Sequence, residues 1–113
     1  MAVLELLVET GWVVETLKAL GGGHMAYLSF AVEQVEPTTL CDLRAGKLAP
    51  GATGEILSIG TVLKPIALFE LVKFNDQPGF IRLDFRLLSV VPFMRGSNQM
   101  DGHEYRCRYR TEP

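Results

Sequence analysis

The first twenty residues are the feature that most constrains how this chain can fold. Residues 3–20 are mainly apolar, contain no proline and one glycine, Gly11, and end at the run Gly21-Gly22-Gly23. On a helical wheel the apolar side chains cover most of the circumference, and one narrow sector holds Glu5, Glu9, Trp12 and Thr16. A helix of this kind is buried inside a protein, and glycine commonly ends helices. The pattern therefore predicts one buried helix against which the rest of the chain packs.

A second interpretation of the same segment is a β-strand followed by a turn. Leu4, Leu6 and Val8 occupy alternate positions, which is the period of a strand. Thr10-Gly11 is suited to a hairpin turn. The helix is the preferred interpretation, and the strand is kept as the alternative.

The middle of the chain has the patterns of an antiparallel sheet. Residues 25–35, 55–63 and 66–74 are predicted strands, and residues 75–79 supply the turn before the next strand. That strand, residues 81–87, has alternating charged and apolar residues, typical of one solvated and one buried face. Its predicted inward residues are Ile81, Leu83, Phe85 and Leu87. Together with the helix, these strands predict an α+β fold, one central apolar helix packed on an antiparallel sheet.

Shorter segments connect and follow these strands. Pro37 interrupts the first strand, residues 40–44 could resume it, and Ala49-Pro50-Gly51 is a turn signal. We expect residues 1–91 to form the domain and residues 92–113 to form a C-terminal loop with a short edge strand or tail. In that tail the residues Tyr105, Cys107 and Tyr109 alternate with Arg106, Arg108 and Arg110.

Composition restricts the environment and partners that we expect. A length of 113 residues fits one domain, and a net charge of −2 gives no general reason to expect nucleic acid as a partner. Acidic residues and Lys18 interrupt the N-terminal apolar run, so we expect neither a signal peptide nor a membrane span. Cys41 and Cys107 are too few for a disulfide framework. We therefore expect a soluble, cytoplasmic protein with reduced thiols.

The order of the predicted elements resembles the hot-dog fold, in which a sheet wraps a central helix. Residues 3–12 resemble the central helix of 3-hydroxyacyl-carrier-protein dehydratases, which often has a glutamate, then a glutamine, a small residue and a glycine. Leu48-Ala49-Pro50-Gly51-Ala52 resembles the turn that begins the third strand of that family. The likeness covers residues 3–91. It implies a dehydratase-like protein of fatty acid metabolism, a lyase acting on an acyl thioester of acyl-carrier protein or coenzyme A.

The resemblance also implies roles for three residues. Glu5 falls on the family's catalytic acid, which helps the substrate hydroxyl leave as water, and Glu9 falls on the family's glutamine. Glu9 and Trp12 would contact the substrate, with Trp12 as a wall of the acyl pocket. The alternatives are that Glu5 and Glu9 mark a solvent-facing strip or favour a helix N-terminus, and that Trp12 is a dimer contact. The family's catalytic histidine precedes the helix and has no counterpart in this sequence, which leaves activity open.

The remaining candidate groups carry weaker patterns. His24 has no second histidine or carboxylate at ligand spacing, so we expect no metal site, and we expect no cofactor. The three C-terminal arginines could bind the phosphates of a carrier arm, or they could form a solvated edge that deters aggregation.

Two classes of function follow. The first is a 3-hydroxyacyl thioester dehydratase-like protein, active or with reduced or no activity, and the second is a non-catalytic hot-dog or β-barrel module that binds an acyl group or a protein partner. In either case we expect a homodimer, since a chain with 48% apolar residues has surface to hide.

Overall fold

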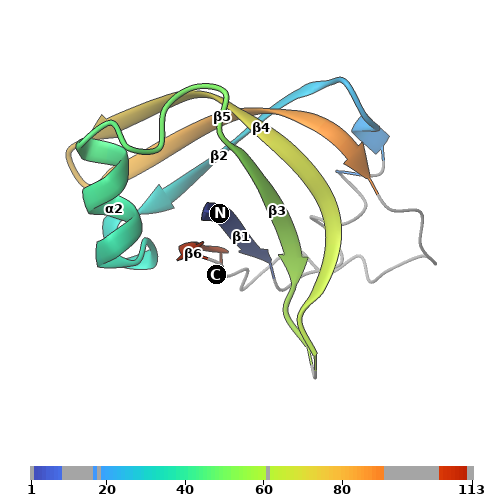
Figure 1. Ribbon diagram of the computed structural model, residues 1–113, viewed down its shortest axis with the longest axis horizontal. Coiled ribbons are helices and arrows are strands. Elements are labelled where there is room, and N and C mark those ends of the chain that lie inside the picture. The colour runs from blue at the N-terminus through green and yellow to red at the C-terminus, as the bar shows by residue number, and fades with distance from the viewer. Residues whose placement is uncertain (1, 9–16, 18, 61, 91–104, 112–113) are drawn as a thin grey trace.

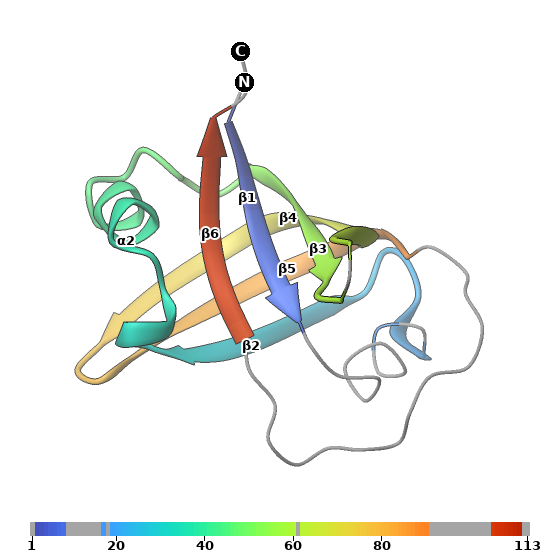
Figure 2. The ribbon, with the colours of Figure 1, turned by 90° about the horizontal axis from the view of Figure 1, so that it is seen from below.

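The fold is built on one curled sheet (Figures 1 and 2). The computed structural model describes residues 2–8, 17, 19–60, 62–90 and 105–111. Within these residues the six strands lie in the order β2-β5-β4-β3-β1-β6. In chain order the strands are β1 (Ala2–Val8), β2 (Met25–Ala31), β3 (Thr53–Ser58), β4 (Lys64–Gln77), β5 (Phe80–Val90) and β6 (Tyr105–Thr111). β1 pairs in parallel with β3, and every other pair is antiparallel.

The prediction of a central apolar helix is wrong, because residues 2–8 form β1. This strand lies between β3 and β6, so it has a strand on each side. Leu4, Leu6 and Val8 join the hydrophobic core, while Glu5 and Leu7 are buried on the opposite face. A strand buried on both faces has no polar alternation, and its sequence cannot be distinguished from that of a buried helix by periodicity. For residues 2–8, the alternative interpretation as a β-strand was correct.

Helical structure does precede the glycine run. Leu17, Ala19 and Leu20 are helical, and the backbone N–H of Gly21 donates to the carbonyl oxygen of Leu17 at 3.0 Å. Gly21 has a φ of 68°, a left-handed conformation that favours glycine. Leu17 is buried in the core. The prediction that glycine ends a helix at this point of the chain is therefore confirmed.

A second helix appears where a strand was expected. Residues 40–44 belong to α2 (Pro37–Arg44), which follows the short 3-10 helix η1 (Val32–Gln34). Pro37 lies in the first turn of α2, where its ring presets the backbone angle and its missing N–H needs no partner. The proline that interrupts one element thus begins the next.

The core fills the concave side of the sheet. The inward residues predicted for β5 are all buried, and the Phe69 and Phe85 rings lie 5.0 Å apart between centroids. Other fully buried side chains in this core are Leu4, Leu6, Phe30, Ile56 and Leu71. Gly54 on β3 permits this packing, since a methyl group there would overlap the Phe69 ring and the carbonyl oxygen of Leu4. Among the described residues, the sheet itself therefore encloses the apolar side chains, and no helix lies at its centre.

The two end strands of the sheet approach each other and give it the shape of a half-barrel. Val35, just after η1, forms a bridge with Cys107 of β6, and the Glu36 N–H donates to the Cys107 carbonyl at 3.1 Å. Phe30 of β2 and Tyr105 of β6 make an edge-to-face contact, with centroids 6.2 Å apart. α2 lies at one end of the half-barrel, beside β6 (Figure 2). In the described part of the chain, no helix is both long and apolar enough to cross a membrane.

Candidate functional site

The only acidic side chain that is fully buried among the described residues belongs to Glu5. Because Leu4 and Leu6 point into the core, the alternation of β1 places Glu5 on the outer, convex face. Its cross-strand neighbours are Arg108 on β6 and Glu55 on β3. A carboxylate removed from water is costly unless it is paired, so its partners define the site.

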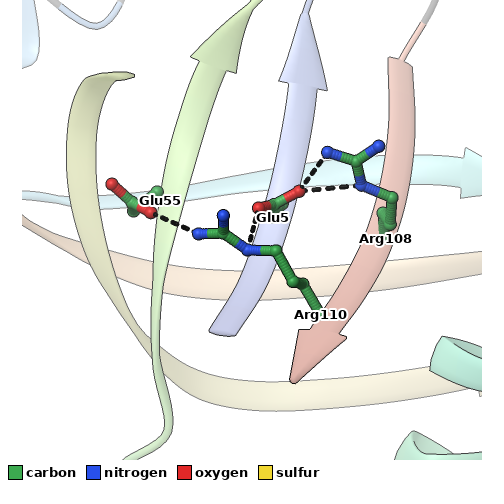
Figure 3. Close-up of polar contacts among 4 residues, drawn as sticks. All are labelled: Glu5, Glu55, Arg108 and Arg110. Carbon is green, nitrogen blue, oxygen red and sulfur yellow. Dashed lines mark hydrogen bonds and ion pairs between the residues drawn. The ribbon is translucent and has the colours of Figure 1, made fainter. Parts of the chain in front are cut away.

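Two arginines of β6 cover this carboxylate (Figure 3). Arg108 donates from Nε and Nη2 to Oε2 of Glu5, at 2.8 and 2.5 Å. Arg110 places its Nε 2.6 Å from Oε1, as an ion pair whose angle does not meet hydrogen-bond geometry. Arg110 also reaches Glu55, with 3.4 Å between Nη2 and Oε1. Both oxygens of Glu5 therefore have a guanidinium group beside them.

The alternation of β6 brings the arginines to this face. Tyr105 and Tyr109 pack against the core and Cys107 lies within it, so the arginines between them point outward. The register of β6 against β1 then sets Arg108 directly opposite Glu5. Arg106 shares the face but is exposed. Arg108 and Arg110 meet Glu5, whereas Arg106 lies opposite Leu7 in the register of the two strands.

An open hollow of about 470 Å³ lies over the cluster. Its lining consists of Glu5, Glu55, Leu57, Leu63, Pro65, Arg108 and Arg110. Leu57 belongs to β3, whereas Leu63 and Pro65 come from the projecting β3–β4 hairpin (Figure 1). The hollow therefore combines two guanidinium groups with an apolar wall.

Accessibility separates the roles of the charged groups. The Glu5 side chain is only 1% exposed, whereas the side chains of Arg108 and Arg110 are 33% and 42% exposed. A guanidinium has five N–H donors, and Arg108 uses two of its nitrogens on Glu5. The carboxylate is thus a positioning group behind the arginines, and the arginines are the groups that a ligand in the hollow would meet.

The predicted site residues have different outcomes. Glu5 lies in the site, but on a strand rather than a helix, while Glu9 and Trp12 lie outside the described residues. Sequence reasoning singled out the three arginines and their common face, but not Glu55 or the hairpin wall. The alternation of residues 105–110 was the available signal for the arginines. Nothing local in the sequence indicated that they lie against Glu5, 103 residues away from Arg108.

The cysteines and His24 show no reactive or metal-binding arrangement in the part of the chain that the structure describes. Burial raises the pKa of the Cys107 thiol to about 12, with a smaller contribution from Glu36, so this thiol is inert at neutral pH. Cys41 is exposed on α2. No group of three or more histidine, cysteine or acidic side chains that could hold a metal ion occurs among the described residues.

Comparisons with known proteins found no match among family models, curated proteins or solved structures. The dehydratase activity stays a prediction. The role inferred for Glu5 depended on a helix at residues 3–20, and residues 2–8 of that segment form β1. The geometry of the arginine cluster is therefore the observation on which a function is argued.

Proposed function

We propose that this protein is a non-catalytic binding module that holds a small carboxylate ligand through Arg108 and Arg110. The observation that carries the proposal is a pair of partly exposed guanidinium groups, held by one fully buried carboxylate, at the surface of an open hollow. Hollows that bind small molecules have volumes of roughly 300–1,000 Å³, and this one is within that range.

Glu5 prepares the two arginines for binding. A flexible arginine loses side-chain entropy when a ligand immobilises it, which reduces affinity. The contacts of 2.5–2.8 Å with Glu5 hold both guanidinium groups before any ligand arrives. Because the planar guanidinium matches a carboxylate in a forked geometry, donors that neither Glu5 nor Glu55 uses are suited to a ligand carboxylate.

The charge of the site favours a singly charged ligand. The hollow holds two guanidinium groups, Arg108 and Arg110, and two carboxylates, Glu5 and Glu55, so these four charges balance, and Arg106 adds one positive charge on the same face of β6 outside the hollow. A phosphate dianion would be repelled more strongly by the two acidic groups than a carboxylate would. Leu57, Leu63 and Pro65 offer apolar contact to a short carbon chain. A small aliphatic carboxylate therefore fits better than inorganic phosphate.

Butyrate is the probe for this proposal, with butyramide as the uncharged control. In an NMR titration of the whole chain, we expect saturable shifts of the Arg108 and Arg110 Nε–H signals with butyrate, at a Kd on the order of 1 mM. Butyramide should give no saturable shift, and inorganic phosphate should bind more weakly than butyrate.

Two substitutions test whether the arginine fork is responsible. Arg108→Lys keeps the charge but loses the fork, and it should weaken butyrate binding about tenfold. Arg86→Lys is the matched control, because Arg86 pairs with Glu70 on another part of the sheet. Absence of saturable shifts in the wild type, or equal binding by the wild type and Arg108→Lys, would overturn the proposal.

A further inference from the structure

A second surface of the molecule gathers exposed apolar side chains on three neighbouring strands. The outer faces of β2, β5 and β4, which are adjacent in the sheet, carry five large apolar side chains that are each at least 41% exposed. We call them the apolar patch: Met25 and Tyr27 on β2, Leu88 on β5, and Leu68 and Val72 on β4. Exposed apolar side chains gathered on one face are typical of interaction sites.

Two ion pairs lie among the side chains of the apolar patch. In the first, Arg82 and Asp84 of β5 pair with each other at 2.8 Å, and the Arg82 guanidinium lies over the Tyr27 ring, 4.1 Å from its centroid. The second pair joins β5 to β4. Arg86 of β5 is paired in register with Met25 on one side and with Glu70 on the other. Arg86 donates from Nη2 to Oε1 of Glu70 at 2.5 Å, and the two side chains remain 50% and 30% exposed. Leu88 follows Arg86 by two residues on β5, so the two side chains share the outer face. On β4, Leu68 precedes Glu70 by two residues and Val72 follows it by two.

The apolar patch also has a recess. A hollow of about 240 Å³ opens between Leu68 and Leu88 and extends to Val3, Thr53 and the backbone of Gly54. Its lining is mainly apolar, apart from Thr53 and Glu55. This hollow can receive an apolar side chain from another molecule.

We propose that a second copy of this chain docks on the apolar patch through a twofold axis. The charge pattern is the reason to choose a second copy, since this face carries two balanced pairs of opposite charge, Arg86 with Glu70 and Arg82 with Asp84, and thus complements itself. In an interface with twofold symmetry, each contact occurs twice. Arg86 of each copy then lies against Glu70 of the other, and the surrounding apolar side chains exclude water from both ion pairs.

The dimer surface adjoins the carboxylate site, because Glu55 lines both hollows and is paired in register with Leu68. The arginine cluster lies on β1 and β6 with the β3–β4 hairpin, whereas the apolar patch lies on β2, β5 and β4. The two proposals are tested by different substitutions.

Sedimentation velocity and light scattering on the full chain test the dimer. At roughly 100 μM chain we expect a mass of twice 12.5 kDa. Arg86→Glu, and separately Glu70→Arg, place like charges opposite each other and should weaken dimerisation tenfold or more. The double variant Arg86→Glu/Glu70→Arg restores opposite charges and should return the dissociation constant to within about threefold of the wild type.

Val62→Ser is the matched control, because Val62 is 76% exposed near the tip of the β3–β4 hairpin and outside the apolar patch. It should leave the mass unchanged, and circular dichroism establishes that each variant is folded. A single-chain mass for the wild type at this concentration would overturn the proposal. A double variant that dimerises as weakly as the single variants would overturn it equally.

Discussion

Removal of the Arg108 guanidinium tests whether Glu5 depends on it. Arg108→Met keeps the apolar part of the side chain but removes the two hydrogen bonds to Oε2 of Glu5. Removing one partner of a buried ion pair commonly costs about 3–5 kcal/mol, because the other charge is left buried. Arg108 is one third exposed and Arg110 still contacts Glu5, so we expect a loss of about 2 kcal/mol in the free energy of unfolding.

Urea unfolding followed by circular dichroism measures this loss. With a urea m-value of about 1–3 kcal/mol/M for a protein of this size, 2 kcal/mol corresponds to a fall of about 1 M in the midpoint. Arg106→Met is the control, because Arg106 lies on the same face of β6 but makes no ion pair with any described residue. We expect that substitution to change the stability by less than about 0.5 kcal/mol.

A double-mutant cycle then isolates the interaction. Glu5→Gln removes the buried charge that Arg108 balances, so losing Arg108 as well should cost less than it does in the wild type. The expected coupling is about 1–2 kcal/mol. If Arg108→Met is no more destabilising than Arg106→Met, or if the two changes add within about 0.5 kcal/mol, the argument for the cluster is refuted.

Three further predictions concern Gly54, Cys107 and the activity expected of Glu5. Gly54 lies against the Leu4 carbonyl and the Phe69 ring, so Gly54→Ala should lower the free energy of unfolding by about 3 kcal/mol in urea titrations. Gly60 has open space around it, and Gly60→Ala should be nearly neutral. Equal effects of the two substitutions would contradict this account. Burial raises the pKa of Cys107 to about 12 from an ordinary value of 9.0, so its stabilising contribution is complete below pH 9 and is lost as the pH rises towards 12. The difference in urea midpoint between the wild type and Cys107→Ala should therefore change between pH 8 and pH 11. A difference that stays constant over this range would count against a raised pKa of Cys107. Since the Glu5 carboxylate is covered by two arginines, we expect no hydration of a crotonyl thioester above background, and turnover that Glu5→Gln abolishes would support the dehydratase hypothesis instead.

The most accurate sequence predictions concern segments with a local pattern. Ile81, Leu83 and Phe85 alternate with charged residues, and this alternation alone identified a strand and its buried face, because the other side of β5 carries charged residues and faces away from the core. A turn at residues 75–79 was predicted from its composition; residues 75–77 belong to β4, and the turn itself lies at Pro78 and Gly79, where Gly79 has a φ of 87°. The helix α2 was missed although Pro37 is a recognised residue for the first turn.

The N-terminal segment shows why a local pattern can fail. Leu4 and Leu6 are buried in the core, but Leu7 on the opposite face is buried as well, so residues 2–8 have no solvated side. Such a run has the same apolar character whether it is a strand or a buried helix, and the choice depends on its neighbours. The presence of β3 and β6 on either side of β1 decided it.

The amino-acid sequence by itself determined which side chains of each strand share a face, because that depends only on alternation along the backbone. Thus the common face of Arg108 and Arg110 could be predicted. That this face lies against Glu5 was decided only by the tertiary structure, since the pairing of β6 with β1 joins residues 103 positions apart. The sheet register, which depends on the packing of the whole core, therefore turns separate charged residues into one site.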